Sequence, residues 1–120
     1  MGTTTSFREL IVWQKAHKFV LAIYDSTQKF PSHELYSLVS QFRRAAISIP
    51  ANIAEGYKRK SKMDKLRFFN IAQASLEECY YFVILSKDLS YINEDIFNKL
   101  EQKIEEVSKL LTSYISKFGI

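Results

Sequence analysis

Apolar residues recur at intervals of three and four along almost the whole chain, which is the spacing of an amphipathic α-helix. Four segments carry this pattern, and each is expected to form one helix: residues 9–29, 31–56, 61–89 and 93–119. Short connections between long helices place successive helices side by side in opposite directions. The pattern therefore predicts an all-α fold, an up-down-up-down antiparallel four-helix bundle.

Capping and helix-breaking residues support these boundaries. Proline and serine at Pro31-Ser32 suit the first turn of the second helix, and Gly56 suits its end. Ser61 and Asp64 have capping-box spacing, and Asn93 is a good N-cap for the fourth helix. We expect each of the last three helices to begin at these residues.

Pro50 lies inside the second predicted helix. A proline has no N–H to donate, and its ring clashes with the carbonyl four residues earlier, here that of Ala46. We therefore predict a kink or a short break near Pro50.

Length and composition are typical of one small globular domain. The chain has 120 residues, of which 47% are hydrophobic, and it has only three glycines and two prolines, which is little turn material for an all-β fold. We expect residues 1–6 to be a disordered leader and residues 7–120 to form a single bundle domain. Cys79 is the one cysteine, so an internal disulfide is excluded, and we expect a buried structural thiol.

The sequence indicates a cytoplasmic protein with no membrane partner. No apolar run approaches the roughly 18 residues of a membrane-spanning helix. The first residues also lack the charged and hydrophobic regions of a signal peptide.

Two of the predicted helices carry more apolar surface than one subunit needs. The third helix has two apolar stripes, and the first shows Ile11, Val12, Phe19 and Leu21 beside its main stripe. A lone bundle would expose more than the few hundred Å² of contiguous apolar surface usual for a monomer. We therefore predict a closed, cyclic homo-oligomer.

Charge is unevenly distributed along the chain. Residues 1–67 carry 12 basic and 5 acidic side chains, whereas residues 68–120 carry 5 basic and 8 acidic ones. Much of the excess lies in one cluster between the second and third helices: Lys58, Arg59, Lys60, Lys62, Lys65 and Arg67. Positive charge at a helix start opposes the helix dipole, so helix stability does not explain it. The cluster is therefore a candidate nucleic-acid-binding site for RNA or DNA. Tyr57, Phe68 and Phe69 flank it and could stack on bases, although core packing is the expected role of the two phenylalanines. A solubilising surface and a contact with a partner protein are the alternatives.

Polar residues also interrupt the apolar pattern where the second and third helices face each other. The members of this predicted structural polar network are Arg44, Asn52, Glu55, Ser75 and Glu78. Buried polar groups must be hydrogen-bonded, and such a network would fix the register of the two helices. A binding pocket for a small molecule or a metal in the bundle core is the alternative.

The residues needed for common catalytic chemistry are missing. Di-iron bundles use Glu-x-x-His pairs, but neither His17 nor His33 follows a glutamate by three residues. No glycine-rich phosphate loop occurs, and no nucleophile has a recognisable histidine and acid partner. We predict that the protein is not an enzyme, with no catalytic residues, no metal and no cofactor.

Several motifs resemble one known family. They are FREL at 7–10, VWQKA at 12–16, FP at 30–31, QFRRAA at 41–46 and SIPANIAEG at 48–56, the last two being the most specific. Arg67-Phe68, Ile71-Ala72 and Ser75-Leu76 continue the match. The chain resembles the four-helix bundle protein family, also called the 23S rRNA-intervening-sequence proteins. It departs from the family pattern at Ala74 and Cys79, which concerns packing detail only.

The resemblance implies a bacterial, cytoplasmic bundle that assembles as a ring-like pentamer and has no established enzymatic activity. A distant relative is the accessory protein of diversity-generating retroelements, a basic pentameric bundle associated with a reverse transcriptase and nucleic acid. We therefore expect a nucleic-acid-binding or RNA-associated accessory protein. The alternative is an interaction scaffold that docks a partner enzyme.

Overall fold

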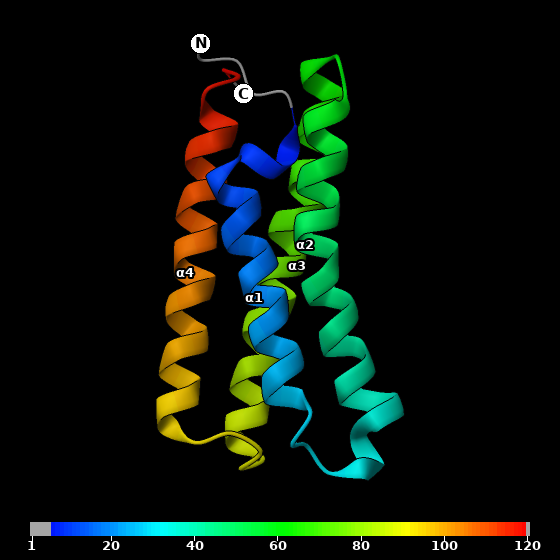
Figure 1. The fold of residues 1–120 in the computed structure, drawn as a ribbon. Helices are drawn as coiled ribbons and strands as arrows, with labels where there is room; N and C mark the ends of the chain where they lie inside the picture. The colour runs from blue at the N-terminus through cyan, green and yellow to red at the C-terminus, as the bar shows by residue number, and fades with distance from the viewer. Residues whose placement is uncertain (1–5, 120) are drawn as a thin grey trace.

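The structure, a computed structural model, describes residues 6–119. Its long α-helices lie side by side along a molecule that measures 46 × 25 × 22 Å (Figure 1). The long helices are α1 (Ile11–Thr27), α2 (Ser40–Lys58), α3 (Lys62–Asp88) and α4 (Glu94–Ser116). The prediction of an all-α four-helix bundle is confirmed.

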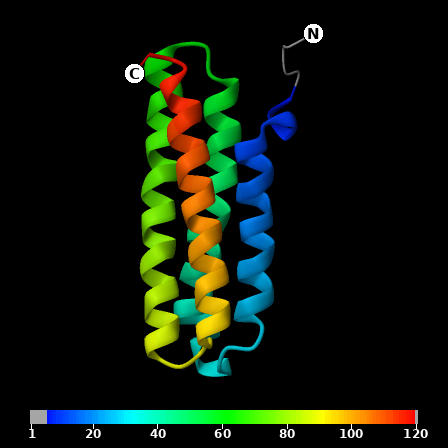
Figure 2. The ribbon, with the colours of Figure 1, turned by 90° about the vertical axis from the view of Figure 1, so that its left-hand side faces the viewer.

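Each long helix borders two others. Contacts join α1 to α2, α2 to α3, α3 to α4 and α4 back to α1. The chain descends along α1, ascends along α2, descends along α3 and ascends along α4 (Figures 1 and 2). One end of the bundle therefore holds the connection between α2 and α3, the short helix η1 (Phe7–Glu9) and the end of α4.

Two of the predicted helix starts are confirmed by their capping hydrogen bonds. The hydroxyl of Ser61 accepts the N–H of Asp64 at 3.1 Å, directly before α3. The side-chain oxygen of Asn93 accepts the N–H of Ile96 at 2.9 Å, directly before α4. Both groups satisfy N–H donors that have no partner within a helix.

The predicted start of the second helix is wrong in detail. A 3₁₀ turn, η2 (Ser32–Glu34), and a π-helical turn, η3 (Leu35–Val39), precede α2. The carboxylate of Glu34 accepts the N–H of Leu38 at 3.4 Å and the hydroxyl proton of Tyr91 at 2.8 Å. Glu34 therefore ties this widened turn to the connection between α3 and α4.

The predicted stop at Gly56 is also wrong, because α2 continues through Gly56 to Lys58. Gly56 is buried, and a Cβ atom at this position would lie 2.7 Å from Cδ1 of Phe69. Close approach between α2 and α3, and not a left-handed backbone, explains this glycine.

The α-helix α2 also continues through Pro50, so the short break that was one of the two predicted alternatives does not occur. The other alternative, a kink near Pro50, stays a prediction.

The first predicted helix begins later than its pattern suggested. Residues 7–9 form the 3₁₀ helix η1, Leu10 is extended, and α1 begins at Ile11. The predicted leader covers residues 1–6; residues 1–5 lie outside the described residues, and the hydroxyl of Ser6 accepts the N–H of Arg8 at 3.1 Å.

The apolar excess is smaller than the sequence suggested. Val12 and Phe19 are buried within the single chain, whereas Ile11 and Leu21 remain more than half exposed, at 60% and 55%. On α3, much of the second stripe is likewise buried within the subunit, including Cys79 and Phe82. The large apolar side chains that stay exposed on α3 are Met63, Ile71, Tyr81 and Ile84.

Cys79 lies in the core as a free thiol, as predicted. Burial, with a smaller effect of the neighbouring Glu78 charge, raises the pKa of the Cys79 thiol to about 12. None of the helices in the described part of the chain is both long and apolar enough to cross a membrane.

Candidate nucleic-acid interface

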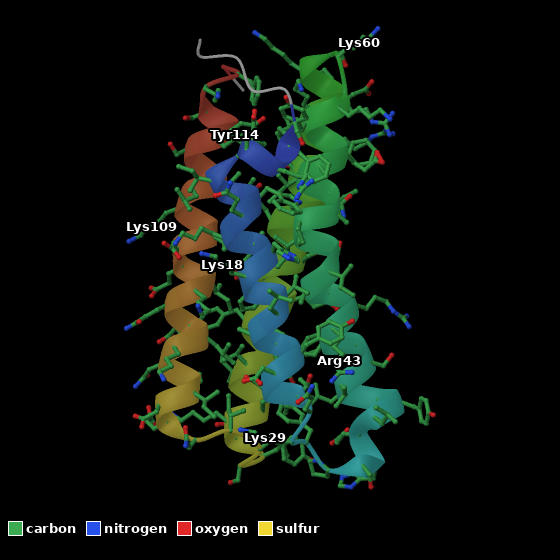
Figure 3. All side chains as sticks on the ribbon, in the orientation of Figure 1. Lys18, Lys29, Arg43, Lys60, Lys109 and Tyr114 are labelled. Atoms are coloured by element: carbon green, nitrogen blue, oxygen red, sulfur yellow. The ribbon has the colours of Figure 1, made fainter. Side chains whose placement is uncertain are left out.

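The predicted basic cluster lies at one end of the bundle, where only residues 59–61 connect α2 to α3. Arg59 has an extended backbone that reverses the chain. Lys60 projects away from the body of the molecule at this end (Figure 3). The tight connection brings cations from the end of one helix and the start of the next onto one small surface.

Lys65 has a structural role within this cluster. Its Nζ donates to the backbone carbonyl of Tyr57 at 2.8 Å and to that of Gly56 at 3.2 Å. These carbonyls belong to the last turn of α2, where a helix supplies few N–H donors, and that of Gly56 also accepts the N–H of Arg59 at 3.2 Å. The ammonium also lies 5.5 Å from the ring centre of Phe118, and burial lowers the pKa of Lys65. Lys65 therefore caps α2, and its charge is directed into the protein.

Arg59 and Arg67 both lie against one aromatic ring. The central guanidinium carbon of Arg59 is 4.6 Å from the ring centre of Phe68, and that of Arg67 is 5.0 Å away. Arg59 also donates to the carboxylate of Glu55 at 3.1 Å. Sequence reasoning placed Phe68 beside the cluster, but it did not show that the ring joins two arginines.

The remaining cations of the cluster are exposed. Lys58, Lys60 and Lys62 make no salt bridge with the described residues. The positive charge of Lys58 interacts favourably with the helix dipole at the C-terminal end of α2, whereas that of Lys62 interacts unfavourably with the dipole at the N-terminal end of α3. We call the five outward cations the basic turn: Lys58, Arg59, Lys60, Lys62 and Arg67.

A groove of about 390 Å³ lies beside the basic turn. Most of its lining is apolar, with Lys58 and Glu55 as its charged members; the lining residues are Ser6, Phe7, Ala51, Ala54, Glu55, Tyr57 and Lys58. Glu55 lines the groove and also pairs with Arg59. The basic turn therefore adjoins an apolar surface that could take a flat apolar group.

Two of the five members of the predicted polar network, Asn52 and Ser75, are joined through Ser48, which sequence reasoning did not include. The Ser48 hydroxyl oxygen accepts from Asn52 Nδ2 at 2.9 Å and lies 2.9 Å from the hydroxyl oxygen of the buried Ser75. Asn52 also donates to the Ser48 carbonyl at 2.8 Å. The four-residue spacing of Ser48 and Asn52 on one helix is the signal that could have identified Ser48.

The charged members of that predicted network make no hydrogen bond with Ser48, Asn52 or Ser75 among the described residues. Glu55 is turned to Arg59. Arg44 and Glu78 are exposed and line a surface hollow of about 450 Å³ with Ser48 and Ser75. Among residues 6–119, no group of three or more His, Cys, Asp or Glu side chains could hold a metal ion. Within this seam, the side-chain hydrogen bonds among the described residues are those of Ser48, Asn52 and Ser75.

Together these features define a four-helix bundle with a basic turn of three lysines and two arginines at one end. The model of the 23S rRNA-intervening sequence protein family matches residues 8–113, and the chain belongs to this family. A solved structure with the same fold is a protein of unknown function of the S23 ribosomal protein family from Bacteroides thetaiotaomicron, with a TM-score of 0.80 and 26% identity. That comparison covers 88% of this chain and 96% of the other. The comparison with curated proteins found no match.

Proposed function

We propose that the protein is a non-enzymatic, cytoplasmic, homo-oligomeric accessory protein that binds RNA or DNA through the basic turn. The observation that carries the proposal is the set of five outward cations on and beside one short connection, of which Arg59 alone has a carboxylate partner within the described chain. Phosphate backbones are bound mainly by such cations. The formal charge of +4 per chain adds long-range attraction for a polyanion.

The proposed assembly is a closed ring, with the pentamer that the family resemblance implies. Exposed apolar side chains on two sides of the bundle support it: Ile11, Leu21 and Ile47 on α1 and α2, and Met63, Ile71 and Tyr81 on α3. Two different apolar faces suit a heterologous contact, which forms a ring when its rotation closes. A ring would repeat the basic turn around one rim and strengthen binding of a long polyanion.

Retention of RNA and DNA at low salt tests the binding proposal. The variant K58A/R59A/K60A/K62A should retain much less of either than the wild type. A matched control removes the same charge from four other exposed lysines: Lys29, Lys99, Lys103 and Lys109. Lys29 lies at the opposite end of the bundle from Lys60 (Figure 3). If both variants lose binding equally, or if the wild type retains neither nucleic acid, the proposal is wrong.

Light scattering tests the assembly separately. A ring requires a mass of several chains at micromolar concentration. A mass of 14.0 kDa, that of one chain, would contradict the ring.

A scaffold that docks a partner enzyme is the second candidate. A groove of about 400 Å³ at the start of α2 favours it, because its lining includes Tyr36, which is 92% exposed. Exposed aromatic side chains are enriched in protein interfaces. Recovery of one protein from the native host that survives nuclease treatment would favour the scaffold; recovery that nuclease abolishes favours nucleic-acid binding.

A further inference from the structure

The cations of the basic turn differ in their surroundings, and the difference points to a more specific ligand. Lys58, Lys60 and Lys62 are isolated point charges, whereas Arg59 and Arg67 lie against the ring of Phe68. We propose that Arg59, Phe68 and Arg67 form a base-stacking subsite for single-stranded nucleic acid. This inference rests on the proposed function of the basic turn.

The arrangement holds two planar cations that would otherwise be flexible. Arg59 follows the end of α2 and Arg67 lies in α3, so Phe68 joins side chains from the two sides of the connection. Glu55 accepts one N–H of Arg59 at 3.1 Å, and a guanidinium has five such donors. The Arg59 side chain is still 41% exposed. Both guanidinium groups are therefore oriented before binding and remain open to solvent, which lowers the entropy lost when a ligand is bound.

Another arginine shows what a purely structural stack looks like. Arg43 lies 4.4 Å from the ring centre of Tyr24, but it is half-buried and its Nε donates to the hydroxyl of Thr27 at 2.9 Å. That contact joins α1 to α2 inside the bundle. The contacts of Arg59 and Arg67 with Phe68 join only the end of α2 to the start of α3, and both arginines are exposed, so packing explains less of them.

Unpaired bases suit this subsite better than a duplex does. Bases of single strands stack on aromatic rings and on guanidinium planes, whatever their sequence. Reading a duplex places a helix or a β-ribbon inside a groove, whereas Arg59 lies on the short connection and Arg67 lies near the start of α3, both at the end of the bundle. A site for phosphate alone would need charge but not the ring of Phe68.

Binding of a labelled oligouridylate, compared with an abasic analogue of the same length, tests the subsite. Fluorescence anisotropy at low salt should show that the wild type prefers the base-bearing strand by roughly fivefold or more. The variant R59K/R67K keeps the charge but loses the planar groups. It should bind the abasic strand as the wild type does and lose the preference. R43K is the matched control and should keep the preference, and thermal melts should show that each variant is folded.

Equal wild-type affinity for the two strands, or a preference that survives in R59K/R67K, would overturn the subsite and leave the proposed function intact. Tighter binding of a duplex of the same length would also overturn it. Failure of the wild type to bind either strand would overturn the subsite and the proposed function together.

Discussion

Replacement of Gly56 by alanine tests the account of how α2 and α3 pack. Away from other groups, Gly→Ala inside a helix stabilises it by about 1 kcal/mol. At this position the new Cβ would lie 2.7 Å from Cδ1 and 3.0 Å from Cζ of Phe69, and closer still to Cε1. Such contacts require one of the two groups to move.

The Phe69 ring has little room to move. It is fully buried and packs against Tyr114 and Phe118, with ring centres 5.4 Å and 6.1 Å away. Overpacking a close-packed core costs about 1–3 kcal/mol, and we expect the upper end for an enclosed ring. After subtraction of the gain in helix propensity, Gly56→Ala should destabilise the protein by about 2 kcal/mol.

Urea unfolding at one fixed protein concentration measures this change, because any oligomer makes stability depend on concentration. Ala51→Gly, at an exposed position of the same helix, is the control for propensity and should cost about 1 kcal/mol. In a Phe69→Leu background the clashing ring is gone, so Gly56→Ala should become neutral or stabilising. A Gly56→Ala protein as stable as the wild type would refute the packing account.

Three further predictions concern single side chains. Lys65→Met removes the cap of α2 and should lower the unfolding free energy by about 1 kcal/mol, whereas Lys60→Met should change it little. Urea unfolding measures both variants, and equal effects would contradict the roles assigned to the two lysines. Ser48→Ala removes the partner of the buried Ser75 hydroxyl and should lower the unfolding free energy by about 1–2 kcal/mol. The double variant with Ser75→Ala should regain most of that loss; additive losses would argue against a shared hydrogen bond. The pKa of Cys79 rises from 9.0 to about 12 on folding, so between these values the unfolded chain loses a proton that the folded chain keeps, and stability should fall as pH rises. Cys79→Ala should show a smaller fall over that range, and the wild-type thiol should react with a thiol reagent only as the protein unfolds.

The helices could be predicted because their signals are local. Ser61 and Asn93 cap α3 and α4 through hydrogen bonds to residues three positions later, which a sequence displays directly. Gly56 was misread because glycine has two uses: a left-handed turn and close approach of helices. Only the position of Phe69 across the interface distinguishes them.

The candidate site could be located from the sequence, but the roles of its members could not. Six cations in ten residues marked the connection, yet Lys65 turns inward to two carbonyls while Arg59 and Arg67 turn to one ring. These differences depend on how the end of α2 meets the first turns of α3. The same holds for Val12 and Phe19, which read as surplus apolar residues until their neighbours in the bundle are known.

The salt dependence of single-strand binding tests the central claim most directly. For a single strand, the logarithm of the association constant falls with the logarithm of salt concentration with a slope of about −0.7 per neutralised phosphate. If the basic turn contacts phosphates, K58A/R59A/K60A/K62A should reduce the magnitude of the slope by up to about 3 relative to wild type. The control without Lys29, Lys99, Lys103 and Lys109 should keep the wild-type slope. Equal slopes for the wild type and the basic-turn variant would contradict the account.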